Sequence, residues 1–335
     1  MKAPTTLAAT AGPDAQPGRR LSPAQLKAMS QRYSMFIVML LVIAYFSYRS
    51  ARFSTPDNLQ TILIAAAPFA LIALGQTLVI LTGGIDLSVG SVIAASGMTA
   101  ALVAKENPGS VALPILAAML VGLLAGCING VLVSRLNVPP FIATLGMLTA
   151  GRGVAYVIGG GAPINGLPAN FGKIANSELL GLKIPVIVMI LGIVLLAVVM
   201  RKTAYGMRIY AVGGNRVASE IAGVNARNVL FSVYAISGLL AGLSGVMLAS
   251  RVISGAPNLG QGYELDSIAA VVIGGASLMG GRGTVLGTVL GLLLIQTLNN
   301  GLDILIVPAY WQDVITGVLI VAAVAVDMWS SRQRE

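Results

Sequence analysis

The sequence predicts an all-α, polytopic integral membrane protein with about ten transmembrane helices, some of them discontinuous. The 335-residue chain is 56% hydrophobic and only 10% charged, and its mean hydropathy is +0.87. Soluble domains carry about 25% charged residues, so the composition argues against a soluble globular enzyme. Uncharged runs recur along the chain, and a membrane-spanning helix needs roughly 20 such residues. The 40 glycines fit close helix packing in lipid.

Ten uncharged runs form one predicted transmembrane domain over residues 33–328. The predicted spans are 33–50, 59–81, 88–104, 111–134, 140–160, 184–200, 229–250, 265–281, 284–302 and 309–328. The eighth run is interrupted by two Gly-Gly pairs, at 274–275 and 280–281. Residues 1–32 are polar and basic, and we expect them to be a disordered tail. Residues 329–335 are expected to form a cytoplasmic C-terminal tail.

The distribution of basic residues predicts the orientation of these spans. With both termini in the cytoplasm, 14 of the 21 Lys and Arg residues lie on the inner side, six lie on the outer side, and Arg152 falls within a span. Inner loops of membrane proteins carry an excess of Lys and Arg. The net charge of +9 is therefore explained by membrane orientation, and nucleic acid is not an expected partner.

Several functions are disfavoured by residues that the chain lacks. It has no His and a single Cys, Cys127, so an imidazole or Cys-cluster metal site is excluded. It also lacks the Gly-x-x-x-x-Gly-Lys-Ser/Thr loop that binds ATP phosphates. The spans contain no series of buried acids such as proton relays use. We therefore expect no catalytic residue, no metal and no cofactor in this chain.

The first candidate segment is Gly83-Gly84-Ile85-Asp86-Leu87-Ser88, which interrupts an apolar region. One interpretation is a helix break beside a transport pathway, where polar main chain is tolerated at membrane depth. The other is a tight cytoplasmic turn in which Asp86 or Ser88 caps the next helix. The segment 83–90 matches 274–281 at four of eight positions, a weak sign of an internal repeat of broken helices.

The second candidate segment is the basic loop 201–228, which the predicted orientation places inside the cell. Asn215 can cap a short helix that continues through Ile221 and ends at Gly223. Val217, Ala218, Ile221 and Ala222 would form one small apolar face. This helix could lie on lipid headgroups, or it could dock a cytoplasmic partner, and the composition alone leaves both interpretations open.

Polar residues near and within the spans are the third set of candidates. Glu264 and Asp266 precede a short span, and we expect them to cap its helix, to dock an external binding protein or to line the outer mouth of a pathway. An uncharged polar substrate requires hydrogen-bonding groups, but interhelical hydrogen bonds are the commoner role of such side chains. Arg152 is expected to snorkel or to pair within the bundle. The uncharged polar residues within the spans are Gln76, Asn129, Thr144, Gln296, Asn299 and Asn300.

Several motifs, taken in order, resemble the permease subunits of ribose-type ABC importers for monosaccharides. The resemblance covers about residues 58–328 and is carried by ILTGGIDLSVGS at 80–91, PFIATLG at 140–146, YAVGGN at 210–215, GYELDSIAAVVIGG at 262–275 and LNNGL at 298–302. It implies a multi-pass protein of the bacterial inner membrane. It also implies three partners besides membrane lipid, namely a cytoplasmic ATP-binding cassette protein, a periplasmic sugar-binding protein and a second permease subunit.

The resemblance assigns expected roles to the candidate residues. The coupling segment that meets the ATPase comprises Asn215, Arg216, Ala218, Ser219, Glu220 and Gly223. The translocation pathway comprises Gly83, Gly84, Asp86, Ser88, Asn129, Thr144, Asn299 and Asn300. Glu264 and Asp266 belong to the outer mouth. ATP would be bound by the partner subunit. The alternative is a stand-alone secondary carrier or facilitator, and the sequence does not identify the sugar.

Overall fold

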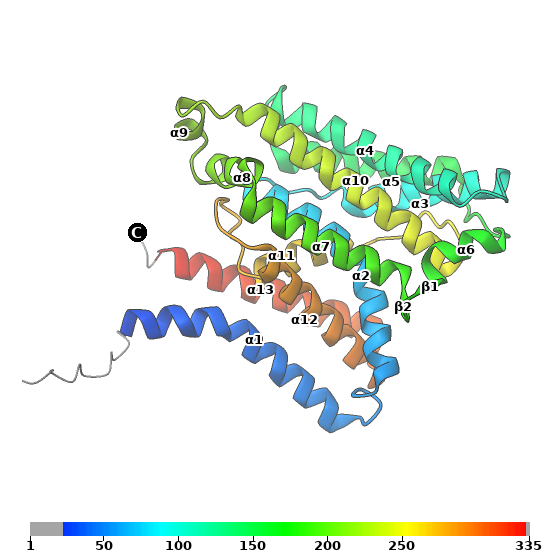
Figure 1. The fold of residues 1–335 in the computed structure, drawn as a ribbon, viewed down its shortest axis with the longest axis horizontal. Helices are drawn as coiled ribbons and strands as arrows, with labels where there is room; N and C mark the ends of the chain where they lie inside the picture. The colour runs from blue at the N-terminus through cyan, green and yellow to red at the C-terminus, as the bar shows by residue number, and fades with distance from the viewer. Residues whose placement is uncertain (1–22, 333–335) are drawn as a thin grey trace, which may run out of the picture.

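The computed structural model describes residues 23–332, which are helical along most of their length (Figure 1). The elements are α1 Pro23–Arg49, α2 Pro56–Leu81, α3 Val89–Glu106, α4 Ala112–Ser134, α5 Pro140–Ile158, α6 Ala169–Asn176, β1 Glu178–Leu179, β2 Leu182–Lys183, α7 Ile184–Lys202, α8 Ala204–Gly214, α9 Arg216–Ile221, α10 Ala226–Val252, α11 Tyr263–Ile273, α12 Val285–Ile304 and α13 Ala309–Arg332. The two strands pair as an antiparallel hairpin. The predicted all-α class is confirmed.

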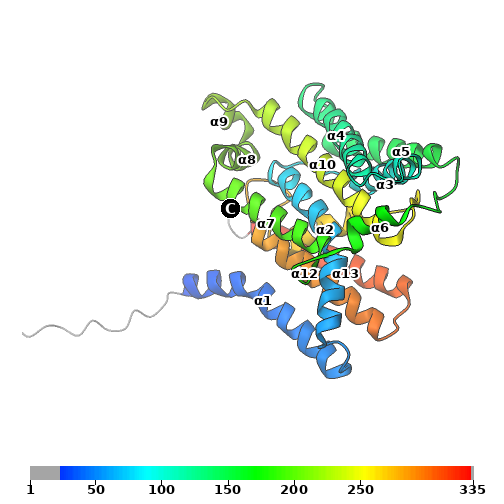
Figure 2. The same cartoon turned by 45° about the vertical axis from the view of Figure 1, so that its right-hand side comes forward.

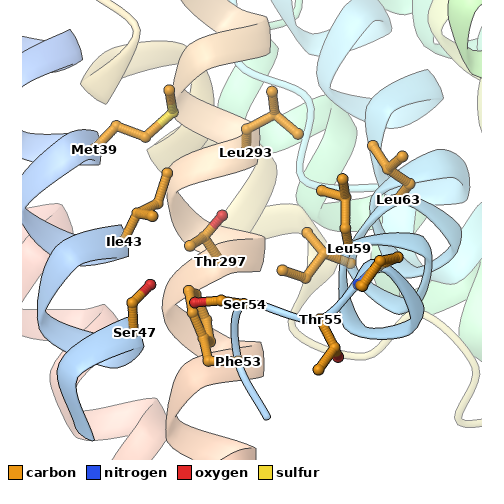
Figure 3. A pocket seen from close by; sticks show the side chains of 12 residues that line it. Met39, Ile43, Ser47, Phe53, Ser54, Thr55, Leu59, Leu63, Leu293 and Thr297 are labelled. Carbon is orange, nitrogen blue, oxygen red and sulfur yellow. The ribbon is translucent and has the colours of Figure 1, made fainter. Parts of the chain in front are cut away.

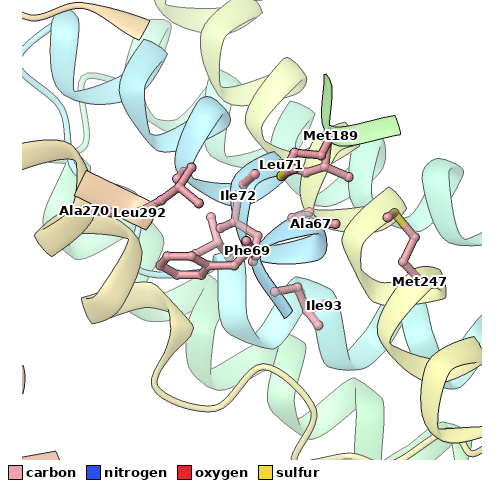
Figure 4. Packing of buried hydrophobic residues seen from close by; sticks show 14 of the residues in the cluster. Ala67, Phe69, Leu71, Ile72, Ile93, Met189, Met247, Ala270 and Leu292 are labelled. Atoms are coloured by element: carbon pink, nitrogen blue, oxygen red, sulfur yellow. The ribbon is translucent and has the colours of Figure 1, made fainter. Parts of the chain in front are cut away.

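Helix α2 forms the centre of the bundle. Its start is defined by Thr55, whose hydroxyl accepts a hydrogen bond from Asn58 N, and by Pro56 in the first turn. Every residue from Ala66 to Leu81 is buried, as expected for a helix that is apolar on all sides. In Figure 4, Phe69, Leu71 and Ile72 of α2 are surrounded by side chains from several other helices, among them Ile93, Met189, Met247 and Leu292.

Helices α4 and α10 pack through glycines. A Cβ atom on Gly238 would lie 2.7 Å from Cα of Gly126, and one on Gly122 would lie 2.7 Å from Cα of Gly242. Real side chains do not fit at these distances, so the two backbones are in direct contact. Small residues at helix interfaces allow this approach in membrane proteins, which explains part of the high glycine content.

Among the described residues, six helices are long and apolar enough to cross a membrane by length and composition, namely α2, α4, α5, α7, α10 and α12. The other four predicted spans correspond to α1, α3, α11 and α13, and the total of ten stays a prediction. Helix α1 begins at Pro23, within the segment predicted as a tail. Residues 1–22 and 333–335 lie outside the described residues.

The predicted eighth span, 265–281, is wrong in its second half. Helix α11 ends at Ile273, and residues 274–284 form a non-helical connection to α12. The cause is the two Gly-Gly pairs, because Gly275 and Gly280 both have φ of +85°. L-amino acids with a side chain rarely adopt this conformation, so the helix cannot continue through these positions.

The two ends of the bundle differ in what they carry. The first turn of α1, the end of α13 and the α8–α9 segment lie at one end, and α6 with the β1–β2 hairpin lies at the other (Figures 1 and 2). This arrangement agrees with the predicted orientation, in which both termini and the basic loop 201–228 are cytoplasmic. We therefore refer to the α8–α9 end as the cytoplasmic end.

Candidate translocation and coupling site

The segment between α2 and α3 leaves the helix and turns back into the bundle. Gly83 has a φ of +78°, which reverses the chain after Leu81. The amide of Gln76 then lies against the main chain of Asp86, with its nitrogen 3.2 Å from the carbonyl oxygen and its oxygen 3.3 Å from the backbone nitrogen. Gln76 thus provides hydrogen-bond partners for the backbone N–H and C=O of Asp86, which lies outside any helix. Buried backbone polar groups require such partners.

The Asp86 carboxyl is the centre of a buried hydrogen-bond network. Only 1% of Asp86 is exposed. Its Oδ1 accepts from Ser88 N at 2.9 Å and from Ser88 Oγ at 2.6 Å, and its Oδ2 accepts from Ser237 Oγ of α10 at 3.1 Å. Asn129 Nδ2 of α4 donates to Ser88 Oγ at 2.9 Å, and Thr144 Oγ1 of α5 donates to Ile85 O at 3.2 Å. The network therefore joins the break to three further helices.

The structure brings four of the predicted pathway residues together in this network: Asp86, Ser88, Asn129 and Thr144. The Ser88 side chain does not cap α3, because its hydroxyl is engaged with Asp86. Asn299 and Asn300 lie apart, near the far end of α12, where Asn300 exchanges two hydrogen bonds of 2.9 Å with Asn58 of α2. The pathway role of all these residues stays a prediction.

Three glycine-containing segments meet at the cytoplasmic end, and we call this contact the glycine junction. It comprises Leu81–Gly84, Gly213–Gly214 and Gly280–Gly281. Gly281 N donates to Leu81 O at 2.9 Å. A Cβ atom on Gly213 would overlap that same carbonyl oxygen and would lie 2.7 Å from Gly281 N. The junction thus joins the end of α8 to the end of α2 and to residues within the α11–α12 connection.

A tyrosine strengthens the link between α8 and the α11–α12 connection. Tyr210 Oη donates to Gly283 O at 2.9 Å. Burial raises the pKa of Tyr210, against the opposing charge of Arg201, so the hydroxyl keeps the proton that it donates. This hydrogen bond therefore holds α8 against the α11–α12 connection.

Helix α9 has the features that the sequence predicted. Asn215 Oδ1 accepts from Ala218 N at 2.9 Å, and Gly223, with φ of +85°, follows its end. Val217 and Ile221 are 68% and 84% exposed. Ser219 is buried, and the Arg216–Glu220 ion pair of 3.1 Å is exposed, so it adds little stability. The helix presents an apolar surface away from the bundle.

Two cavities differ in their suitability for a polar solute. One of about 480 Å³ lies between α1, α2 and α12, and Figure 3 shows Met39 and Ile43 of α1 opposite Leu293 of α12. Its lining is mostly apolar, which suits lipid chains better than a hydroxyl-rich molecule. The other, about 230 Å³, lies beside the glycine junction and is lined by Gly83, Gly84 and Arg216 among others. It brings predicted pathway and coupling residues together.

Glu264 and Asp266 lie in the first turn of α11, which packs against α2 and α3. The Tyr263 ring contacts that of Phe69, midway along α2, with 5.7 Å between centroids. A Cβ atom on Gly90, in the first turn of α3, would overlap the Glu264 carboxyl. Residues 253–262, which we call the unwound segment, precede α11 and contact α3 at Ile93 through Gly260. The outer-mouth role of the two acids stays a prediction.

Arg152 pairs within the bundle, which confirms one of its two expected arrangements. Its Nη1 donates to Pro257 O at 2.7 Å and to Leu259 O at 3.1 Å, both in the unwound segment. Sequence reasoning missed this segment and also missed Ser237. The glycines at 255, 260 and 262 around Pro257 are a signal that could have indicated non-helical chain. Ser237 carries no such signal, because a lone Ser in an apolar helix is indistinguishable from a small packing residue.

Sequence similarity identifies the family to which the chain belongs. The family described as "Branched-chain amino acid transport system / permease component" matches residues 58–324. The chain belongs to this permease family. Together with six long apolar helices, membership makes it a multi-pass protein of the bacterial inner membrane.

The permease is similar to several curated transport proteins over most of its length. It is 42% identical over 302 residues to the ribose import permease protein of Bacillus subtilis (89% of this chain and 92% of that one). It is 43% identical over 311 residues to the ribose import permease protein of Escherichia coli K12 (90% and 95%), and 36% identical over 306 residues to that bacterium's D-allose transport system permease (90% and 93%). No solved structure matches the chain.

Proposed function

We propose that this chain is the membrane subunit of an ATP-binding-cassette importer that carries a monosaccharide or a related small polyol into the cell. A separate cytoplasmic ATPase subunit drives the transport. A periplasmic binding protein delivers the sugar, and a second copy of this chain completes the pathway.

The observation that carries the proposal is the exposed apolar surface of α9 at the cytoplasmic end. Val217 and Ile221 extend from a short, well-capped helix whose neighbour α8 is held in the glycine junction. Val217 and Ile221 are four residues apart and share one face of α9, where both are available to contact a partner protein. The similarity to ribose and allose permeases supports an ATPase as the partner and a sugar as the cargo, and it disfavours a carrier that works alone.

The glycine junction supports a mechanism for coupling. When ATP binding moves the ATPase, α9 and α8 follow, and the contact of Gly213 with Leu81 O carries the displacement to α2 and α11. The transporter then changes between inward-facing and outward-facing states. Nucleotide can drive this change only by stabilising one of the two states more than the other.

Reconstitution tests the proposal. The chain is placed in proteoliposomes with the ATPase and binding protein encoded beside it, and uptake of radiolabelled D-ribose, D-allose, D-galactose and L-leucine is measured with and without ATP. We expect ATP-dependent uptake of one or more sugars and stimulation of ATP hydrolysis by the loaded binding protein. Sugar flux that needs neither ATP nor the binding protein would instead establish a stand-alone carrier, and uptake of leucine alone would contradict the sugar assignment.

A pair of substitutions tests α9 as the docking site. Replacing Ile221 by Asp places a charge in the proposed interface, and we expect uptake to fall about tenfold or more, the size of effect seen when a central contact is lost. Leu180→Asp is the matched control, because Leu180 is 93% exposed in the hairpin at the opposite end. Equal uptake by the two variants would contradict docking through α9.

A further inference from the structure

The exposed face of α5 differs from the face that α7 presents to its surroundings. On α7 the exposed residues Ile190, Leu191, Val194, Leu195 and Val198 are all large and apolar, as lipid contact requires. On α5 the exposed residues toward both ends are also large and apolar, among them Ile142, Leu145, Val154 and Val157. Between them the exposed positions are Gly146, Thr149, Ala150 and Gly153, and nothing lies within 4 Å of a Cβ atom built on Gly146 or Gly153. The middle of α5 therefore presents a surface of small residues between two apolar ends.

Arg152 belongs to this part of α5, and it is only half-buried. The residue before it, Gly151, contacts Ser91 near the start of α3, which places Arg152 well within the bundle. Both of its hydrogen bonds among the described residues are made through Nη1, to Pro257 O and Leu259 O. A guanidinium has five N–H donors, so Nε and Nη2 remain available to a further acceptor.

The acceptors of Arg152 belong to main chain that has left the helix at membrane depth. Gly260 and Gly262, with φ of +68° and +87°, give the unwound segment its course. Non-helical chain at this depth is found only where protein buries it or where it lines a water-filled cavity. The pairing with Arg152 therefore marks either a packing contact or the wall of a polar route.

Glu264 distinguishes between these two roles. Arg152 and Glu264 both reach the same part of the unwound segment. Arg152 Nη1 donates to Leu259 O, and a Cβ atom on Gly90 would meet both the Glu264 carboxyl and the carbonyl oxygen of the next residue, Gly260. Glu264 Oε2 is buried and has no hydrogen-bond partner among the described residues. Leaving a buried acceptor unpaired is costly, and such groups in native proteins call for an explanation. A ligand hydroxyl would supply the missing donor.

We propose that Arg152 and Glu264, with the carbonyl groups of the unwound segment, form a sugar-binding station on the translocation pathway. The proposal rests on the proposed function and deepens it by assigning residues that recognise the sugar. Nε and Nη2 of Arg152 donate to sugar oxygens, and Oε2 of Glu264 accepts from a sugar hydroxyl. A neutral polyol offers donors and acceptors together, which matches this pair. A site with so few contacts binds sugar weakly. Weak binding suits a transport site, because the site must also release the sugar.

The test uses the reconstituted importer with its ATPase and binding protein, with D-ribose and 2-deoxy-D-ribose as probes. The variants are Glu264→Gln, Arg152→Gln and Arg152→Lys. For Glu264→Gln and Arg152→Gln we expect ribose uptake to fall roughly tenfold, which corresponds to one lost hydrogen bond to a charged group. Arg152→Lys, which keeps the charge but loses the forked donors, should fall between them and the parent chain.

Two further measurements distinguish sugar recognition from a merely structural role. The ratio of ribose to deoxyribose uptake should approach one in the variants, because the hydroxyl no longer finds its partner. Stimulation of ATP hydrolysis by the loaded binding protein should be retained. Glu178→Gln is the matched control, since this carboxylate pairs with Lys183 at 2.8 Å in the outer hairpin, and its uptake should equal that of the parent.

The outcomes are distinct. Unchanged ribose uptake and an unchanged ratio in Glu264→Gln would overturn the station. If all three variants lose uptake, ATPase stimulation and thermal stability, the station would also be overturned, because the pair would then have a structural role. Failure of the parent chain to take up any sugar with ATP would overturn the proposed function itself, and the station with it.

Discussion

Two carboxyl groups lie close to the first turn of α3, and their surroundings differ. Asp86 precedes the helix and has hydrogen bonds on both oxygens, from Ser88 and Ser237. Glu264 lies beside Gly90 in that first turn, and its Oε2 has no partner among the described residues. The two carboxyl groups thus lie against the same end of α3 and differ in their hydrogen bonds.

The contrast suggests that the surroundings of Asp86 and those of Glu264 have different roles. A fully satisfied buried network fixes one conformation, and the Asp86 network fixes the break between α2 and α3 against α4, α5 and α10. An unsatisfied group beside a half-exposed cation costs stability and must be explained by something that binds there. We therefore assign Asp86 a structural role, and sugar binding by Glu264 is the proposal made above.

The largest expected effect is that of Asp86→Ala. The substitution removes the acceptor of three hydrogen bonds and leaves the Ser237 hydroxyl and the Ser88 backbone N–H without it. Hydrogen bonds to charged groups contribute about 1.5–3 kcal/mol each, so we expect a loss of about 3 kcal/mol or more. Thermal unfolding in detergent and the amount of folded protein in membranes measure it. A variant as stable as the parent would show that the network is not structural.

A smaller effect is expected for Ser237→Ala, which removes one donor to Asp86. We expect a loss of about 1–3 kcal/mol, because Asp86 Oδ2 is then left unsatisfied. Ser96→Ala is the matched control: Ser96 is also buried in a helix, but its hydroxyl has no partner among the described residues. Unfolding curves of the two variants should separate clearly, and coincident curves would contradict the role given to Ser237.

The smallest effect on stability is expected for Glu264→Gln. Oε2 has no hydrogen bond to lose among the described residues, and the substitution removes a buried unpaired charge that costs stability, so we expect the variant to be at least as stable as the parent. The same unfolding assay measures it beside Asp86→Asn, which should be markedly less stable. If Glu264→Gln destabilises as much as Asp86→Asn, the two carboxyl groups do not differ in the way described here.

Much of the fold could be predicted from the sequence, because the apolar runs are long and the charges are few. The helix boundaries of α2, α4 and α12 fall close to the predicted spans for this reason. The capped helix α9 was predictable because Asn215 and Gly223 act locally, through one side-chain acceptor and one positive φ.

The candidate site was less predictable, because its contacts join residues far apart in the chain. Nothing local indicates that Ser237 reaches Asp86, or that Arg152 meets the carbonyl groups of Pro257 and Leu259. The surroundings of Glu264 were hard to predict for a related reason. A hydropathy profile locates spans by long apolar runs, so it does not detect a non-helical segment that packs between helices.

The glycine junction has a consequence for how such a transporter can diversify. Gly213 meets Leu81 through main-chain atoms, so no side chain can be added there without separating the two segments. Helix α9, in contrast, ends in open surroundings, and its exposed positions are free to change. If α9 docks an ATPase as proposed, recognition of that partner and the contact of α8 with α2 depend on different residues. Replacing residues 216–221 by those of a relative should then change which ATPase the chain accepts and leave the glycine junction unchanged.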